Sequence, residues 1–227
     1  AGLQAYRFES EGLMSSWEEE DQVRLVGLCG KAGAGKDFTL MYLQETWERA
    51  TGGTAIRLAF ADGVREEVED YFYEDTEGQR VDFWAKPYDE VVRHLLQWWG
   101  TDYRRSQDPE YWVKFGMAKV PSTVAAYEGL LEKGVDMFPL LIVFTDVRFE
   151  NEAEAIQDAG GRVFEVMAPD ELRALRLGVT PEQLEEQSRH ASEVMDFETN
   201  GVIMNDSDDY PPRALQQSVA LYLGWTS

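Results

Sequence analysis

Short apolar runs alternate with longer amphipathic stretches along most of the chain. Each apolar run spans four to eight residues and is rich in Val, Ile, Leu or Phe, which is typical of strands buried on both faces. The five predicted strands are Val23–Cys29, Thr54–Phe60, Phe138–Thr145, Arg162–Met167 and Gly201–Met204.

The intervening stretches carry apolar residues at three- and four-residue spacing, which predicts helices. In the first of them, Leu40, Leu43 and Trp47 share one face. The predicted helices are Lys36–Ala50, Asp89–Trp99, Glu150–Ala159 and Pro211–Leu223. This alternation predicts an α/β fold with a doubly wound, mainly parallel sheet of about five strands, whose ligand lies at the carboxyl ends of the strands.

Three segments depart from simple alternation. Residues 61–134 are helical in pattern throughout, and we expect this insert to form a substrate-binding flap. Residues 168–190 contain few large apolar side chains and predict a mobile lid. Residues 1–22 show no strand or long amphipathic pattern and predict a flexible extension, whereas residues 23–227 contain no Pro/Gly/Ser-rich linker and predict a single domain.

Composition narrows the classes of partner. The chain has 21 Lys and Arg against 43 Asp and Glu, a net charge of −22. Such a surface repels phosphate backbones and anionic lipids, so neither nucleic acid nor a membrane is an expected partner. A hydrophobic content of 44% excludes a disordered chain, and the single cysteine, Cys29, excludes an internal disulfide. We therefore expect a protein of the reducing cytoplasm, in which any phosphate site concentrates basic groups locally.

A glycine-rich segment joins the first predicted strand to the first predicted helix. It reads Gly30-Lys31-Ala32-Gly33-Ala34-Gly35-Lys36, the pattern of a phosphate-binding P-loop. Glycines let several N–H groups converge on one anion, the helix adds the positive end of its dipole, and the lysine adds a charge for the β- and γ-phosphates. The pattern indicates a P-loop NTPase three-layer sandwich. The predicted ATP-binding residues here are Gly30, Gly33, Ala34, Gly35, Lys36, Asp37 and Phe38.

The position after the P-loop lysine is Asp37, where Ser or Thr usually ligates Mg²⁺. A carboxylate is a good ligand for this hard cation, so we expect Asp37 to bind the metal, with Thr39 as the second candidate. An acidic residue in the first turn of a helix is also explained by the helix dipole, and this alternative stays open.

Charged residues gather where the third predicted strand ends. Asp146 follows that strand directly, where a second P-loop carboxylate normally lies near Mg²⁺, and Arg148 begins the next loop. Glu152 lies at the start of the next helix, where capping is the alternative explanation. We expect Lys36, Asp146 and Arg148 to be the catalytic residues.

Further polar residues lie in the insert and the lid. Arg93 and Gln97 share one helix face, which suits a phosphate and a base edge. Trp112 could stack on a nucleobase, or it could belong to the core. Three lid arginines, Arg173, Arg176 and Arg189, could neutralise a transferred phosphoryl group or form salt bridges with nearby glutamates. Arg104 and Arg105 are explained as solvated charges.

Six motifs in order resemble those of the phage-type deoxynucleoside monophosphate (dNMP) kinases, a branch of the P-loop nucleoside monophosphate kinase superfamily. The resemblance covers roughly residues 23–220. That family also has Asp after the lysine but then Thr or Ser, where Phe38 stands here. The motifs are Gly30–Asp37, Ala61–Arg65, Leu96-Gln97 with Gly100–Asp102, Tyr111–Lys114, Asp146–Arg148 with Glu152, and Asn205-Asp206.

The resemblance implies transfer of the γ-phosphoryl group of ATP to a dNMP, with Mg²⁺ as cofactor. ATP and a dNMP are the expected partners, a homodimer is an open possibility, and a phage-encoded protein would act in the host cytoplasm. Asn205 and Arg176 fall on the ATP side. The expected dNMP-binding residues are Arg65, Arg93, Gln97, Trp112, Asp146, Arg148 and Glu152.

Three other interpretations stay open, one of which is a degenerate kinase-like fold without activity. Another small-molecule kinase, of the dephospho-coenzyme A or phosphomevalonate type, would use the same P-loop for a different acceptor. A nucleotide-binding regulatory protein would bind ATP with no acceptor, and the missing Ser or Thr after Lys36 favours it.

Overall fold

The computed structural model describes residues 23–72, 81–84, 90–131, 139–188, 195–207 and 212–223. Within these ranges five strands form one sheet in the order β2-β3-β1-β4-β5, and every neighbouring pair is parallel. The predicted fold class is confirmed. The strands are β1 (Val23–Cys29), β2 (Thr54–Leu58), β3 (Leu140–Phe144), β4 (Arg162–Met167) and β5 (Gly201–Met204).

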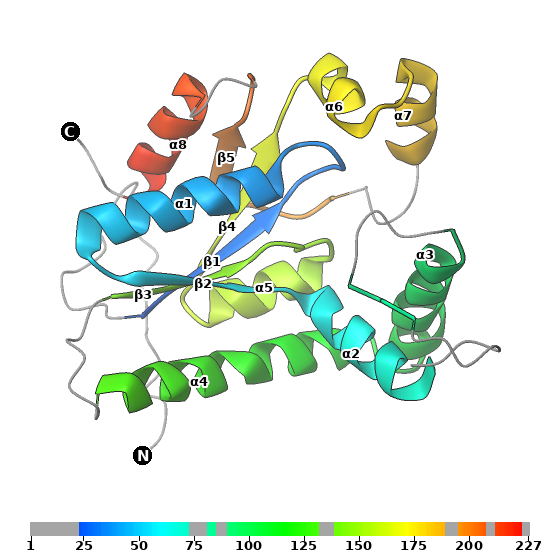
Figure 1. Ribbon diagram of the computed structural model, residues 1–227, viewed down its shortest axis with the longest axis horizontal. Helices are drawn as coiled ribbons and strands as arrows, with labels where there is room; N and C mark the ends of the chain where they lie inside the picture. The colour runs from blue at the N-terminus through cyan, green and yellow to red at the C-terminus, as the bar shows by residue number, and fades with distance from the viewer. Residues whose placement is uncertain are drawn as a thin grey trace.

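Helices cover both faces of the sheet (Figure 1). None of the helices in the described ranges is long and apolar enough to cross a membrane. The α-helices are α1 (Lys36–Thr51), α2 (Phe60–Phe72), α3 (Glu90–Gln97), α4 (Tyr111–Leu131), α5 (Glu150–Asp158), α6 (Asp170–Leu177), α7 (Pro181–Ser188) and α8 (Arg213–Leu223), and a π-helix, η1, spans Trp98–Arg105.

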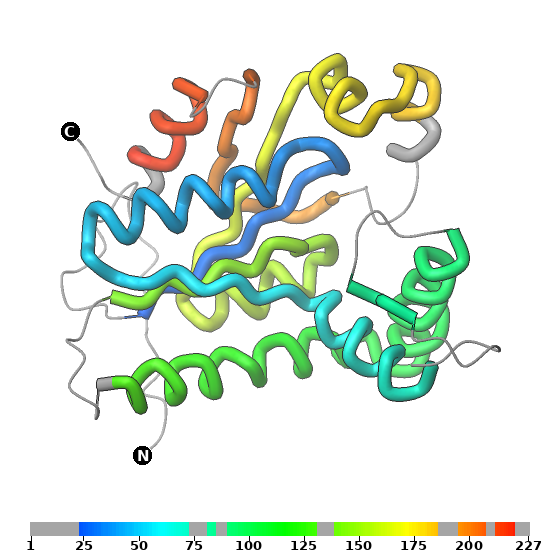
Figure 2. The backbone as a smooth tube through the Cα atoms, viewed as in Figure 1, coloured from blue at the N-terminus to red at the C-terminus, as the bar shows by residue number. Residues whose placement is uncertain are grey.

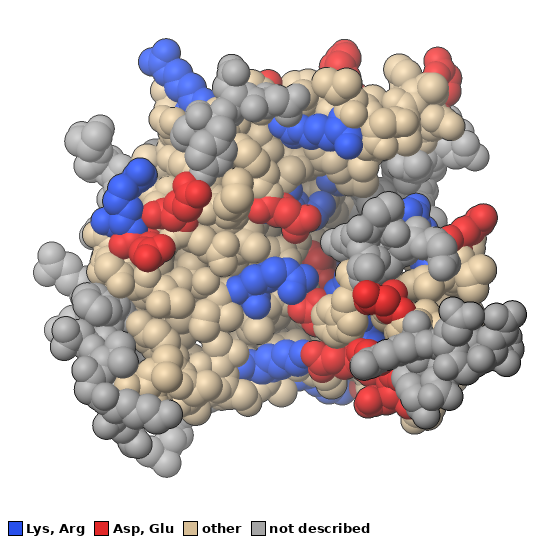
Figure 3. All heavy atoms as spheres, viewed as in Figure 1, with Lys and Arg blue, Asp and Glu red and all other residues tan. Residues whose placement is uncertain are grey.

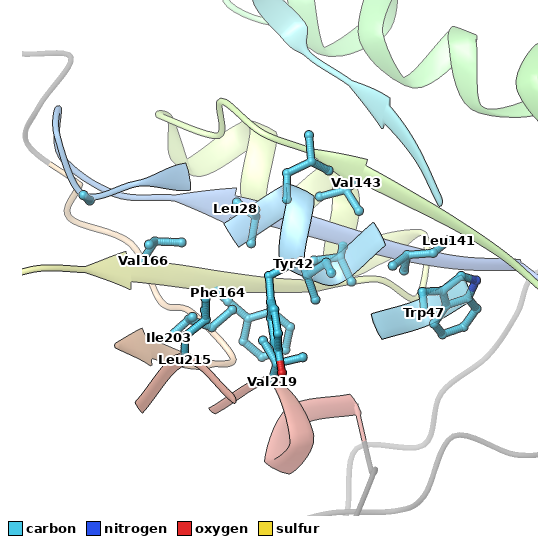
Figure 4. Packing of buried hydrophobic residues seen from close by; sticks show 14 residues of the cluster. Leu28, Tyr42, Trp47, Leu141, Val143, Phe164, Val166, Ile203, Leu215 and Val219 are labelled. Carbon is cyan, nitrogen blue, oxygen red and sulfur yellow. The ribbon is translucent and has the colours of Figure 1, made fainter. Parts of the chain in front are cut away.

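The core on one face lies between the sheet and the pair α1 and α8 (Figure 4). Trp47 of α1 is fully buried there, and its indole Nε1 donates a hydrogen bond to Pro139 O at 3.0 Å. Leu215 and Val219 of α8 pack on the same cluster, as their four-residue spacing predicts. Burying these side chains holds α1, and therefore the loop that precedes it, in a fixed position on the sheet.

The opposite face packs against α4, α5 and the start of α2. The rings of Phe60 and Phe144 stack with centroids 4.6 Å apart. The predicted second strand is too long, because Phe60 begins α2 instead of ending β2. The reason is tertiary: the Asp146 carboxylate accepts the backbone N–H groups of Phe60 and Ala61 and so starts the helix there.

Within the predicted insert of residues 61–134, the described residues of α2, α3, η1 and the start of α4 pack around a core of their own. Trp99 and Trp112 are central to that core. The predicted helix Asp89–Trp99 ends at Gln97 as an α-helix and continues as η1, while Asp89 lies outside the described residues. The predicted extension, residues 1–22, and Arg189 of the predicted lid also lie outside them.

Candidate active site

The carboxyl ends of all five strands meet at one edge of the sheet, because the strands are parallel. The P-loop follows β1, Asp146 follows β3 and Asn205 follows β5. In Figure 2 the P-loop, drawn in blue, lies beside α6, drawn in yellow. The predicted ATP and acceptor segments are thus brought to the same edge.

The P-loop backbone uses the freedom of its glycines. Gly30, Gly33 and Gly35 have φ values of 140°, 76° and 90°, which L-residues with a Cβ rarely adopt. The ammonium group of Lys36 donates hydrogen bonds to Gly30 O and, at 3.2 Å, to Lys31 O. Lysine and loop therefore already lie together at the start of α1, as an anion-binding turn requires.

These features fix the fold type: a parallel sheet whose central strand runs through a glycine-rich turn and lysine into a helix. The fold is that of a P-loop NTPase. The chain matches no protein-family model and no curated protein sequence.

Solved structures resemble the chain over most of its length. TT1252 from Thermus thermophilus is 20% identical, with 91% of this chain and 99% of that one covered and a TM-score of 0.45. A shikimate kinase from Acinetobacter baumannii in complex with shikimate is 16% identical, with 90% and 95% covered and a TM-score of 0.35. An unliganded sugar kinase from a Janibacter species is 13% identical, with 90% and 99% covered and a TM-score of 0.37. What this chain does must follow from its own residues.

Asp146 joins the end of β3 to the start of α2. Its Oδ1 accepts the N–H of Phe60 at 2.9 Å and its Oδ2 accepts the N–H of Ala61 at 2.8 Å. Burial raises the pKa of Asp146, and the two amides and the nearby Arg148 only partly offset this effect. Arg148 itself is exposed at the same strand end. Asp146 and Arg148, two of the three residues that the sequence predicts as catalytic, thus lie close enough for their charges to interact.

Glu152 is almost completely buried, with 2% of the residue exposed. Its Oε2 accepts the backbone N–H groups of Arg148 at 2.8 Å and Phe149 at 3.3 Å, so the carboxylate caps α5 as the alternative explanation states. Its Oε1 forms an ion pair with Arg105, whose guanidinium carbon lies 3.8 Å from the Phe149 ring centroid. The expectation that Arg105 is a solvated charge is therefore wrong.

The environment of Glu152 makes the stability of the protein depend on pH. Burial raises the pKa of this carboxyl to about 7, although the charge of Arg105 acts in the opposite direction. The folded state then holds the proton more tightly than the unfolded state, whose pKa is near 4.5. Ionisation of Glu152 should therefore cost stability as pH rises from about 4.5 to about 7, and nothing further above that range.

We expect Glu152→Gln, which resembles the protonated acid, to gain stability relative to the original chain over this pH window, by on the order of 2–3 kcal/mol. Urea unfolding of both proteins at a series of pH values measures this difference in the free energy of unfolding. Glu150→Gln, at an exposed position of the same helix, is the matched control for removing a carboxylate from this helix. If the difference in unfolding free energy between Glu152→Gln and the original chain did not change with pH, the raised pKa of Glu152 would be contradicted.

Arg104, the neighbour of Arg105, is also paired. Its guanidinium contacts Glu67 of α2 and lies 4.9 Å from the ring centroid of Tyr111. The expected solvated charge is thus part of the insert's internal packing. Consecutive arginines of η1 therefore bind two carboxylates on different helices, Glu67 on α2 and Glu152 on α5. This arrangement connects the insert to the loop that carries Arg148.

Sequence reasoning missed Arg57, which lies near the carboxyl end of β2. Its Nη1 lies 2.8 Å from Asp62 Oδ2, and Arg65 Nη1 lies 2.6 Å from the other oxygen of the same carboxylate. Partial burial disfavours the charge of Arg57, but the hydrogen bond to Asp62 and the charges of nearby carboxylates outweigh it and raise its pKa. Those carboxylates are Asp62, Asp146 and Asp37. The sequence signal that could have revealed Arg57 is a charged residue within an otherwise apolar predicted strand.

The other predicted acceptor-binding residues differ in their exposure to solvent. Arg93 and Gln97 are exposed on α3, as binding residues can be. Trp112 is 2% exposed, and its indole Nε1 donates to Gly100 O at 2.8 Å within the insert core. A base could stack on Trp112 only after the insert rearranged, so packing accounts for this residue in the present conformation.

Asn205 and Arg176 lie behind the P-loop. Asn205 is fully buried and its Nδ2 donates to Ala34 O at 3.0 Å. Arg176 donates to Asn205 Oδ1 at 3.3 Å and to Ser207 O at 3.0 Å. The two predicted ATP-binding side chains thus contact each other and the loop.

On the face shown in Figure 3, basic side chains lie among acidic ones despite the net charge of −22.

The predicted metal ligands differ in their access to the site. Asp37 is exposed in the first turn of α1, and its charge acts on Arg57. Thr39 is fully buried and its hydroxyl has no hydrogen-bond partner, so a metal ion could contact it only if α1 moved. The described residues contain no group of three or more His, Cys, Asp or Glu that could hold a metal ion. Asp37 fits Mg²⁺ that is bound mainly by nucleotide phosphates, as is usual for this cation.

Proposed function

We propose that this protein is a P-loop kinase that transfers the γ-phosphoryl group of ATP to a deoxynucleoside 5′-monophosphate, giving ADP and a dNDP. One observation carries the proposal: the P-loop with its lysine and a second set of cationic side chains share one edge of the sheet. The second set consists of Arg57, Arg65 and Arg148. Arg57 and Arg65 share the carboxylate of Asp62, whereas Arg148 is exposed, and a phosphate is the kind of ligand that cations gathered beside a P-loop favour.

The chemistry requires alignment and charge neutralisation, with no covalent enzyme intermediate. An oxygen of the acceptor phosphate attacks the γ-phosphorus, a new P–O bond forms, and the bond from the γ-phosphorus to the bridging oxygen breaks to release ADP. Lys36 would contact the donor phosphates, while Arg65 and Arg148 would hold the acceptor phosphate. Mg²⁺, held through Asp37, would supply further neutralisation of the phosphate charges.

The acceptor is proposed to be a nucleotide because of α3 and the motif resemblance. Arg93 and Gln97 are exposed and four residues apart, so they can present a cation and an amide to one ligand. An amide offers a donor and an acceptor to a base edge. The ordered motifs from Ala61 to Glu152 favour a deoxynucleotide over dephospho-coenzyme A or phosphomevalonate.

A coupled assay of ADP release identifies the acceptor. ATP and Mg²⁺ are supplied with dAMP, dGMP, dCMP, dTMP, 5-hydroxymethyl-dCMP, dephospho-coenzyme A or phosphomevalonate in separate reactions. We expect at least one dNMP to stimulate ADP release well above the rate with ATP alone. A signal from a non-nucleotide acceptor only would overturn the substrate assignment, and no stimulation by any acceptor would favour an ATP-binding regulatory protein.

A further inference from the structure

The P-loop is held from behind by side chains of other elements. Arg173 Nε, on α6, donates to Ala32 O at 2.8 Å. Asn205 Nδ2, after β5, donates to Ala34 O at 3.0 Å, and Arg176 Nη1 lies 3.3 Å from Gly33 O and 3.4 Å from Ala34 O. The carbonyls of three consecutive P-loop residues are therefore turned toward α6 and Asn205.

The direction of a carbonyl sets the direction of the next amide. In a planar trans peptide the C=O and the following N–H point in opposite directions. Because Ala32 O faces Arg173, the N–H of Gly33 points away from α6, and the N–H of Gly35 does the same because Ala34 O is held. Both glycines have positive φ values. A turn that mixes positive and negative φ values gathers its backbone N–H groups around an anion. The N–H of Ala34 instead closes a turn on Lys31 O at 3.1 Å.

Arg173 also brings a buried charge to the loop. Its side chain is 3% exposed, and its Nη1 contacts Asp170 Oδ1 at 2.6 Å, but the Asp170 side chain is 76% exposed. Water screens that carboxylate far more than it screens the buried guanidinium. A buried cation behind Ala32 therefore adds positive potential to the face where phosphate would bind.

We propose that Arg173 is a positioning residue for polyphosphate binding: its guanidinium fixes the Ala32–Gly33 peptide so that the Gly33 N–H faces the nucleotide phosphates. This role differs from that of an arginine closing over the transferred phosphoryl group, because Arg173 contacts the far side of the loop. The inference rests on the proposed function only in requiring that the P-loop bind a polyphosphate. It holds whichever acceptor is used.

Calorimetric titration with inorganic tripolyphosphate and Mg²⁺ tests the proposal, because this probe has no base or sugar. We expect Arg173→Met, which keeps the apolar stem, to weaken binding by about tenfold or more. Asp170→Asn removes only the exposed partner and should change binding by less than about threefold. Arg173→Met that binds within about twofold of the original chain would overturn the proposal.

Two further measurements separate positioning from general destabilisation. Arg173→Lys keeps the charge and is expected to bind tripolyphosphate more tightly than Arg173→Met, which a loss of folding alone would not produce. If Arg173→Met fails to fold, Arg173→Lys is compared with the original chain instead. Tripolyphosphate binding and amide exchange at Gly33 and Gly35 that were both unchanged in Arg173→Lys would contradict the proposal. In the kinase assay the KM for ATP should rise while the KM for the acceptor stays constant.

The outcomes also distinguish this inference from the proposed function. Tripolyphosphate binding that depends on Arg173, without transfer to any dNMP, would support the positioning role and contradict the dNMP kinase assignment. Transfer to a dNMP that is unaffected by Arg173→Met would support the dNMP kinase assignment and contradict the positioning role. Absence of tripolyphosphate binding by the original chain would contradict the positioning role, while the proposed function would still be decided by transfer to a dNMP.

Discussion

Lys36→Met should reduce ATP-dependent phosphoryl transfer on the order of 10²–10³-fold or more, because one preorganised charge is lost from the donor phosphates. Lys36 is the first residue of α1, and its ammonium group already contacts the loop carbonyls of Gly30 and Lys31. Methionine retains most of the side-chain length and removes only the charge and its donors. The coupled ADP assay at saturating acceptor measures the effect.

The matched control is Lys119→Met on α4, which removes a lysine paired with Glu66 in the insert. We expect its turnover to remain close to that of the original chain. Urea unfolding of both variants shows whether the fold is retained. Near-normal turnover by a folded Lys36→Met protein would refute the assignment of the P-loop as the donor site.

Gly30→Ala is the substitution that should damage the P-loop most through structure alone. Gly30 has a φ of 140°, and a Cβ at this position would lie 2.4 Å from the backbone oxygen of Val166. The strand that carries Val166 is held between β1 and β5, so it cannot give way cheaply. We expect a loss of about 3 kcal/mol in the free energy of unfolding, together with loss of nucleotide binding.

Gly129→Ala is the control for this effect. Gly129 lies in α4, where a Cβ would meet no atom within 4 Å. Alanine favours a helix, so this variant should be more stable by up to about 1 kcal/mol. Chemical unfolding of both variants gives the comparison, and equal stabilities for Gly30→Ala and Gly129→Ala would exclude the close approach to Val166.

The fold could be predicted from the sequence because its signals are local. The apolar runs that became β1, β4 and β5 have the predicted ends. The end of β2 could not be predicted, because the choice between strand and helix at Phe60 depends on Asp146, which lies 86 residues away. The π-helical continuation of α3 through Trp98–Arg105 likewise has no periodic signature in the sequence.

The candidate site was predictable where a motif carries its own chemistry, as in the P-loop. Residues whose role depends on distant partners were misjudged or missed. Arg105 appears in the sequence as a surface charge, yet it pairs with the buried Glu152, 47 residues away. Trp112 satisfies a motif but is used by the insert core. Arg173 has its P-loop contact with Ala32, 141 residues away, and no local pattern could indicate it.

The most direct test of the central claim follows the phosphoryl group itself. ATP labelled in its γ-phosphate is incubated with the protein, Mg²⁺ and the dNMP that best stimulates ADP release, and the labelled products are separated. We predict that the label appears in the β-phosphate of the corresponding dNDP, with Lys36→Met as the background. Label that remains in ATP, or that appears only as inorganic phosphate, would contradict the proposal that this protein is a dNMP kinase.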